Sequence, residues 1–207
     1  MVCSKSDGTY SQNLADEIVT LARCLATNTI PHDYISTLLA SRLVPLKRKK
    51  NSIRPVGVGK CLWRIIGKTI QDCYRTTSSM HFSRNTTVMC GKLKSTIETA
   101  IHAVRKSYKD ENRCLLLVDA DNTFNKLNRK VSLENIKTVC VPMYRYLHNS
   151  YNTPTMLLYI SKMGATYSTL SQEGVTQGDN AAMAMYALST RPLMQTLSSE
   201  TANDDVK

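Results

Sequence analysis

The sequence contains no long apolar run, and this absence limits the classes of protein it can encode. Nowhere in the 207 residues is there an apolar stretch close to the roughly 20 residues that a membrane-spanning helix needs. The first residues also lack the apolar segment of a secretory signal. We therefore expect an intracellular protein with no membrane partner, in the nucleus or the cytoplasm. With 42% apolar residues, the chain can still bury a sizeable core.

Paired cysteines and acidic residues are also scarce. The seven cysteines are scattered and form no Cys-x-x-Cys pair, which favours reduced thiols in the core over disulfides or a zinc site. The 27 basic residues outnumber 16 acidic ones and give a net charge of +11. This excess predicts a polyanionic partner, nucleic acid before membrane, because basic side chains bind phosphates of any sequence. A ribosomal or chromatin protein would have the same charge.

The residues present include two acids at the end of a short apolar segment. Residues 114–118 predict a buried strand that ends in Asp119 and Asp121. Carboxylates at the mouth of a strand are suitable ligands for a hard cation such as Mg²⁺. The same acids could instead cap the helix that is predicted from Val131, and the spacing alone favours this second interpretation.

Periodicity predicts the remaining elements. Two strand pairs with short connections are expected as β-hairpins, at 42–46 with 53–57 and at 155–160 with 167–171. The polar residues 198–207 are expected to be frayed. Amphipathic helices are predicted over 12–28, from Pro31 to Leu39, and over 60–74, 95–109, 131–139 and 143–150, with a long helix after residue 178.

Three segments, taken together and in this order, resemble reverse transcriptases of non-LTR retroelements. Leu43–Leu46 and Ile53–Val56, on either side of a basic turn, resemble the fingers hairpin. Asp119 and Phe124, an acid and an aromatic with four residues between them, resemble motif A. The segment Glu-Gly-Val-Thr-Gln-Gly-Asp at 173–179 resembles motif B, whose core is Gln-Gly-Asp-Pro.

The resemblance covers residues 40 to 197 and implies an α+β fold. We expect the fingers and palm of a right-hand polymerase, with an antiparallel palm sheet backed by helices and with part of the palm missing. The expected division is an N-terminal helical region at 1–41, a fingers-like region at 42–112, a partial palm with motifs A and B at 113–197, and a tail at 198–207.

The same resemblance implies a metal site and a sugar contact. Asp119 would be the catalytic acid and would bind Mg²⁺ together with the Ala120 carbonyl. The family uses two such ions, which Mn²⁺ could replace, to clamp the attacking and leaving oxygens. Phe124 would lie beneath the sugar and exclude a ribose 2′-hydroxyl, although one of only two phenylalanines in the chain could equally be a plain core residue.

The resemblance also implies contacts to the incoming deoxynucleoside triphosphate. Arg54 and a lysine of the first strand would contact the triphosphate, since a guanidinium donates two parallel hydrogen bonds and keeps its charge. Lys47 is the better lysine candidate, although the length of the turn hardly separates it from Arg48. Gln177 and Gly178 would line the pocket for nucleotide and template.

Two departures from the family pattern bear on activity. Asn180 stands where the family has proline, which we expect to loosen the start of the following helix. Motif C, an aromatic-x-Asp-Asp turn between two apolar strands, is missing, because the pair Asp204-Asp205 lacks the flanking strands. We therefore expect a chain that ends before motif C and is inactive alone.

The expected function is that of an RNA-directed DNA polymerase fragment, with RNA template, DNA primer and deoxynucleoside triphosphates as partners. Whether this chain is itself an enzyme stays open at this stage. The main alternative is a non-catalytic, basic remnant that still binds nucleic acid. A third possibility is a fragment that folds poorly because half of the palm sheet is absent.

Overall fold

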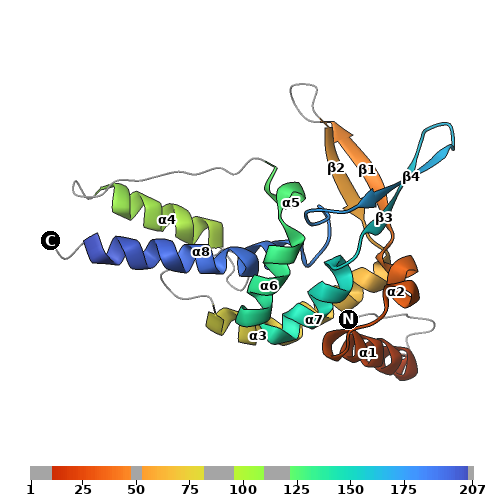
Figure 1. Ribbon diagram of the computed structural model, residues 1–207, viewed down its shortest axis with the longest axis horizontal. Helices are drawn as coiled ribbons and strands as arrows, with labels where there is room; N and C mark the ends of the chain where they lie inside the picture. Colours follow the sequence, from red (N-terminus) through yellow and green to blue (C-terminus); the bar gives the residue numbers. More distant parts are fainter. Residues whose placement is uncertain (1–10, 48–52, 82–95, 110–121, 205–207) are drawn as a thin grey trace.

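The computed structural model describes residues 11–47, 53–81, 96–109 and 122–204 (Figure 1). They form an α+β fold, in which a four-stranded sheet is backed by helices. Among these residues no helix has the length and apolar character that a membrane crossing requires. The helices are α1 (Gln12–Thr27), α2 (His32–Leu39), α3 (Cys61–His81), α4 (Thr96–Tyr108), α5 (Thr123–Lys126), α6 (Arg129–Val139), α7 (Val141–Tyr151) and α8 (Ala182–Asp204), and the strands are β1 (Ser41–Lys47), β2 (Ile53–Val58), β3 (Thr155–Ile160) and β4 (Thr166–Ser171).

Both predicted hairpins are confirmed, and they share one sheet with the strand order β2-β1-β3-β4. Within each hairpin the strands are antiparallel, β1 with β2 and β3 with β4. The first strands of the two hairpins are parallel, with Ser41 opposite Leu157 and Arg42 opposite Leu158. The expectation of an antiparallel sheet is therefore corrected, since the described sheet is mixed. The division into fingers-like and palm regions stays a prediction.

The main core lies where α3 and α7 meet. Trp63 of α3 stacks on Tyr146 of α7 with ring centroids 5.4 Å apart, and both side chains are buried. Helices α1 and α6 add apolar side chains from two further directions, and the first half of α8 packs on α6. Burial of these apolar surfaces is the main stabilising term. The largest fully buried core side chains, apart from Tyr146, are Leu25, Ile66, Ile136, Met143, Leu147, Met185 and Leu188.

The connection between α1 and α2 is fixed by a buried polar side chain from α7. Asn149 Nδ2 donates to the carbonyl oxygens of Leu25 at 3.0 Å and Asn28 at 2.8 Å. Its Oδ1 accepts from the N–H of Ile30 at 3.0 Å. One amide thus satisfies three backbone groups that have left the helical hydrogen-bond pattern, and a buried group of this kind is costly to leave unpaired.

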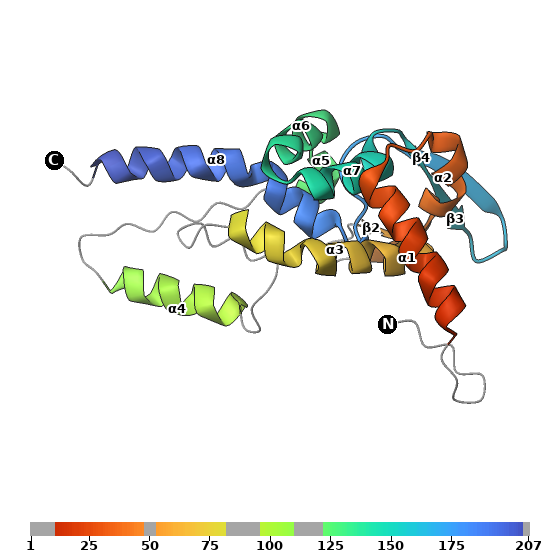
Figure 2. The same cartoon turned by 90° about the horizontal axis from the view of Figure 1, so that it is seen from below.

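Two other expectations from the sequence are corrected. Helix α8 continues to Asp204, so 198–204 is helical although a frayed tail is predicted there. No proline or glycine occurs between 193 and 204 to end the helix, and this half of α8 extends beyond α3 and α7 (Figure 2). Of the described cysteines, Cys140 is buried, whereas Cys24, Cys61 and Cys73 are exposed, so core thiols are not the rule.

Replacement of Asn149 by alanine is expected to lower the free energy of unfolding by about 2–4 kcal/mol, because three backbone groups in buried or partly buried hydrogen bonds lose their partner. Urea unfolding followed by circular dichroism measures this value. The matched control is Asn152→Ala, an exposed asparagine just after α7, which is expected to change the value by less than about 0.5 kcal/mol. Equal effects of the two substitutions would contradict the role of Asn149.

Candidate functional site

The connection between β4 and α8 carries the motif-B-like segment and lies against the outer edge of β2. The N–H of Gly57 donates to the carbonyl of Gln177 at 2.8 Å. Strand β2 is at the edge of the sheet and pairs with β1 on its other side. The segment around Gln177 therefore lies where a further strand would pair with β2. It accepts a hydrogen bond from an edge N–H that points away from β1.

Two predicted site residues meet at this contact. Arg54 Nε donates to Gln177 Oε1 at 2.7 Å, across 123 positions of sequence. Arg54 is exposed and Gln177 is half-buried. Among the described residues no carboxylate pairs with Arg54, so the terminal nitrogens of its guanidinium keep donors for an anion.

Gly178 is required by the close approach of the two segments. Its φ is +103°, in the left-handed region that side chains disfavour. A Cβ at this position would lie 2.6 Å from the carbonyl oxygen of Gly57 and 3.2 Å from Val56 Cγ1. Glycine thus permits a close backbone approach at this position, and the neighbour that approaches it is β2.

Lys47 is separated from Arg54 by the pleat of the sheet. Leu46 is the register partner of Arg54, whereas Lys47 is the partner of Ile53. Directly opposed residues share a face and successive residues alternate, so Lys47 and Arg54 project from opposite faces at the same end of the hairpin. The structure brings Arg54 to Gln177 but does not bring Lys47 to them. Arg48, the second lysine-equivalent candidate, lies outside the described residues.

Phe124 touches the same connection through its backbone. Its carbonyl accepts from the N–H of Val175 at 2.7 Å, and its half-buried ring packs on Tyr186 of α8 with centroids 5.8 Å apart. The ring thus packs at the margin of the core, which agrees with the alternative interpretation of Phe124 as a core residue. Its contact with a sugar stays a prediction. Gly174 (φ +69°) lies so close to this turn that its Cβ would be 2.3 Å from the Asn125 carbonyl oxygen.

The aspartate of the motif-B-like segment serves the fold. Asp179 Oδ2 accepts a hydrogen bond from the hydroxyl of Tyr151, and Oδ1 accepts from the N–H of Ala181 at 2.9 Å. Desolvation raises the pKa of Asp179, while these two hydrogen bonds and the charge of Arg64 act in the opposite direction. The carboxylate is therefore committed to holding the start of α8.

Asn180 fixes this helix start, and the expectation that it loosens it is corrected. Its Nδ2 donates to the carbonyl of Arg64 at 2.6 Å, and its own carbonyl accepts from Gln71 Nε2 at 2.8 Å. Both contacts join the connection to α3. Proline could not make the first of them, because it has no side-chain donor.

Sequence reasoning missed Arg129, which donates several hydrogen bonds to this part of the chain. Its buried guanidinium donates to oxygens of Ser171, Glu173 and Gly174, and lies 5.4 Å from the centre of the Tyr151 ring. In the sequence it is an arginine at the start of an amphipathic helix, which is typical of an exposed position. No local signal marks its burial.

The predicted metal ligands Asp119 and Ala120 lie outside the described residues. Within the described part of the chain, no group of three or more His, Cys, Asp or Glu side chains could hold a metal ion. The nearby carboxylates are used by the protein, Asp179 as above and Glu173 by accepting the N–H of Arg129 at 2.7 Å. The described residues alone therefore do not form a Mg²⁺ site, and metal binding by Asp119 stays a prediction.

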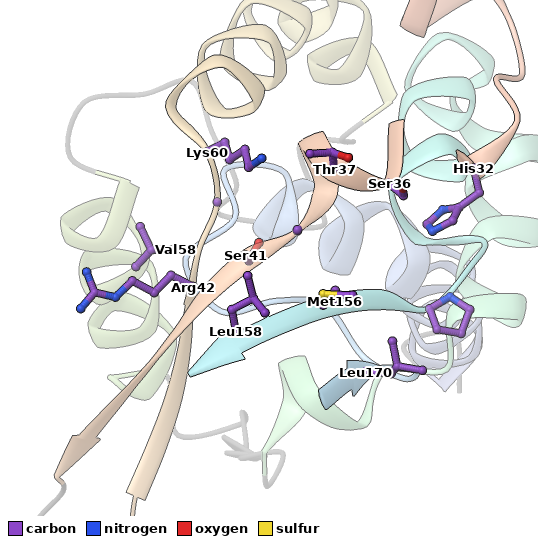
Figure 3. Close-up of a pocket in the computed structure, with 13 residues that line it drawn as sticks. His32, Ser36, Thr37, Ser41, Arg42, Val58, Lys60, Met156, Leu158 and Leu170 are labelled. Atoms are coloured by element: carbon purple, nitrogen blue, oxygen red, sulfur yellow. The ribbon is translucent and has the colours of Figure 1, made fainter. Parts of the chain in front are cut away.

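A cavity of about 500 Å³ opens beside the sheet and α2, and its lining includes Arg42, Val58 and Leu158 (Figure 3). By strand alternation and register, these three residues and Arg54 share one face of the sheet. The floor is apolar, Arg42 and Lys60 supply positive charge, and the lining contains no acidic residue. The cavity therefore offers an apolar surface beside two cations.

Comparison with solved structures gives a distant likeness. No family model and no curated protein matches the sequence. A solved structure of apo telomerase from Candida tropicalis, truncated from the C-terminal domain, is similar with a TM-score of 0.47 and 13% identity. The alignment covers 92% of this chain and 46% of that chain, so this chain spans about half of its length. The function proposed below rests on the motifs and contacts of this chain itself.

Replacement of Gly178 by alanine is expected to detach the connection from β2, because the new Cβ would collide with the Gly57 carbonyl. Gly164→Ala is the matched control, since Gly164 also has positive φ (+83°) but a Cβ there would have no atom within 4 Å. Both variants bear the conformational strain of about 1 kcal/mol. Urea unfolding should show a further loss of about 1–3 kcal/mol for Gly178→Ala alone. Equal losses would mean that the close approach is unimportant.

Proposed function

We propose that this chain is the fingers and partial palm of a reverse transcriptase of non-LTR retroelement type, an RNA-directed DNA polymerase. The observation that supports this most is the hydrogen bond between Arg54 and Gln177. The two residues belong to separate segments that resemble the fingers hairpin and motif B. The resemblance assigns both to the nucleotide site, and a chance resemblance gives no reason for them to meet in the fold.

In this proposal Arg54 binds the triphosphate of the incoming deoxynucleotide. Its Nε is used by Gln177, which fixes the plane of the guanidinium and leaves the terminal nitrogens to donate to phosphate oxygens. Gln177 is held in turn by Gly57. Such preorganised donors stabilise charge on a transferring phosphoryl group without rearrangement during the reaction.

Asp119 and the Ala120 carbonyl would hold the metal. A bound Mg²⁺ supplies activation of the primer hydroxyl and neutralises charge on the phosphates. This assignment comes from the resemblance to motif A. The described residues add no further carboxylate ligand to it.

RNA template and DNA primer are the proposed macromolecular partners. The cavity beside the sheet and α2 places Arg42 and Lys60 beside an apolar floor, a combination suited to a phosphate backbone with an unpaired base. The net charge of +11 adds sequence-independent attraction. In this proposal Arg42 and Lys60 contact phosphates of the strand, and an unpaired base lies on the apolar floor.

Binding of nucleic acid without catalysis is the second candidate function. It is favoured by the two hydrogen bonds that engage the Asp179 carboxylate within the protein. A single metal-binding aspartate would give weak metal affinity. The two candidates share the binding surface and differ in nucleotide incorporation.

Primer extension separates them. The chain and its Asp119→Ala variant are compared on poly(rA)/oligo(dT) with Mg²⁺ or Mn²⁺, while anisotropy measures template–primer binding from low to high salt. We expect binding that weakens steeply with salt and no incorporation by this chain alone, a result that would favour the non-catalytic candidate for this chain. Incorporation that Asp119→Ala abolishes would establish the polymerase and exclude the non-catalytic candidate. Absence of both binding and incorporation would refute both.

Arg54→Ala is expected to weaken deoxynucleoside triphosphate binding by roughly 10- to 100-fold, because a charged hydrogen bond contributes about 1.5–3 kcal/mol. The affinity of Arg54→Lys should lie between those of the wild type and Arg54→Ala. Lysine keeps the charge but cannot contact Gln177 and two phosphate oxygens together. Isothermal titration calorimetry gives the affinities. Arg23→Ala, an exposed arginine on α1, controls for the loss of one positive charge and should leave the affinity unchanged.

A further inference from the structure

The proposed function leaves one buried cation without a role. Arg129 is the first residue of α6 and its side chain is 6% exposed. Arginine is almost never buried to this extent without partners. Burial lowers the pKa of its guanidinium from the ordinary value, which reflects the cost of removing the charge from water. The partners that offset this cost show what the burial achieves.

Every nitrogen of the guanidinium donates to one short segment. Nε donates to the carbonyl of Gly174 at 2.7 Å, and Nη1 to the carbonyl of Ser171 at 2.8 Å. Nη2 donates to Ser171 Oγ at 2.7 Å and, at the longer distance of 3.4 Å, to the carbonyl of Glu173. The backbone N–H of Arg129 donates to Glu173 Oε1 at 2.7 Å. Residues 171–174 are thus held directly to the start of α6.

The held segment lies three residues before Gln177. On the other side of Gln177, Asp179 accepts from the hydroxyl of Tyr151, and the ring of Tyr151 lies 5.4 Å from the Arg129 guanidinium. Both ends of 175–178 are therefore fixed by one buried cluster. The residues between the two ends are those that meet β2.

We infer that Arg129 is a positioning residue that holds the β4–α8 connection so that Gln177 meets Gly57 and Arg54. Its contribution is geometric, because a planar fork with fixed donor directions spans Ser171 and Gly174 at once. Lysine at this position would keep the charge but would concentrate its donors on one nitrogen. The inference rests on the proposed function for its effect on nucleotide binding, whereas its effect on the loop is measurable without any ligand.

Hydrogen exchange of the Gly57 amide reports this loop contact, because that N–H donates to Gln177 and not to β1. In Arg129→Lys, followed by NMR, we expect exchange at Gly57 to become at least about tenfold faster, as for an amide released from a hydrogen bond. The neighbouring amides of Val56 and Val58 point toward β1 and should keep their rates. A purely structural role would accelerate all three together.

The matched control is Arg145→Lys. Arg145 is an exposed arginine on α7 whose Nη1 donates to Thr29 Oγ1 at 3.0 Å, and its replacement should leave Gly57 exchange unchanged. The inference is overturned if Arg129→Lys leaves the Gly57 rate unchanged, if Val56 and Val58 accelerate equally, or if Arg145→Lys has the same effect.

A milder variant keeps the test decisive if Arg129→Lys does not fold. Ser171→Ala removes a single acceptor of the guanidinium and should accelerate Gly57 exchange by a smaller factor, again without change at Val56 and Val58. No change at Gly57 would then overturn the inference. Titration of the wild-type chain with a deoxynucleoside triphosphate tests the proposed function independently of Gly57 exchange. If the triphosphate does not bind but Gly57 responds as expected, the proposed function fails and the positioning role stands.

Discussion

The free edge of β2 is the constraint on which the candidate site depends. An edge strand carries backbone groups without partners, and it is open to pairing with other chains unless something covers it. Here the N–H of Gly57 donates to Gln177, so the β4–α8 connection both covers the edge and is located by it. Arg54 lies three residues earlier on the same strand, and its contact to Gln177 follows from this docking.

The connection is held far more firmly than an ordinary surface loop. Gly174 and Gly178 both have positive φ, and at both positions a Cβ would collide with a backbone carbonyl oxygen. Arg129 and Asp179 are removed from water and compensated by hydrogen bonds to neighbouring backbone or side-chain groups. Desolvated charges are costly unless they are paired, so these hydrogen bonds and close approaches restrict the connection to one conformation.

Local patterns in the sequence predicted most of the fold. Alternation and helical periodicity predicted both hairpins and the helices that become α1, α3 and α6, because these features depend on neighbouring residues. Two features have no local signature, because they depend on residues more than 40 positions apart. One is the parallel pairing of β1 with β3, and the other is the burial of Arg129 against Ser171. The meeting of Arg54 and Gln177 was predictable only through the family resemblance. The placement of Lys47 on the opposite face follows from alternation once the register is known.

The described residues of the site bring together basic donors and form no cluster of carboxylates that could hold a metal ion. Asp179, the acid nearest to Gln177 in sequence, accepts hydrogen bonds from the Tyr151 hydroxyl and the Ala181 N–H, so its carboxylate is engaged within the protein. Arg54 keeps donors toward solvent, and Arg42 lies on the same sheet face beside an apolar floor. In the proposed function the described residues would therefore supply preorganised donors for phosphate, and the proposed metal site would rest on Asp119.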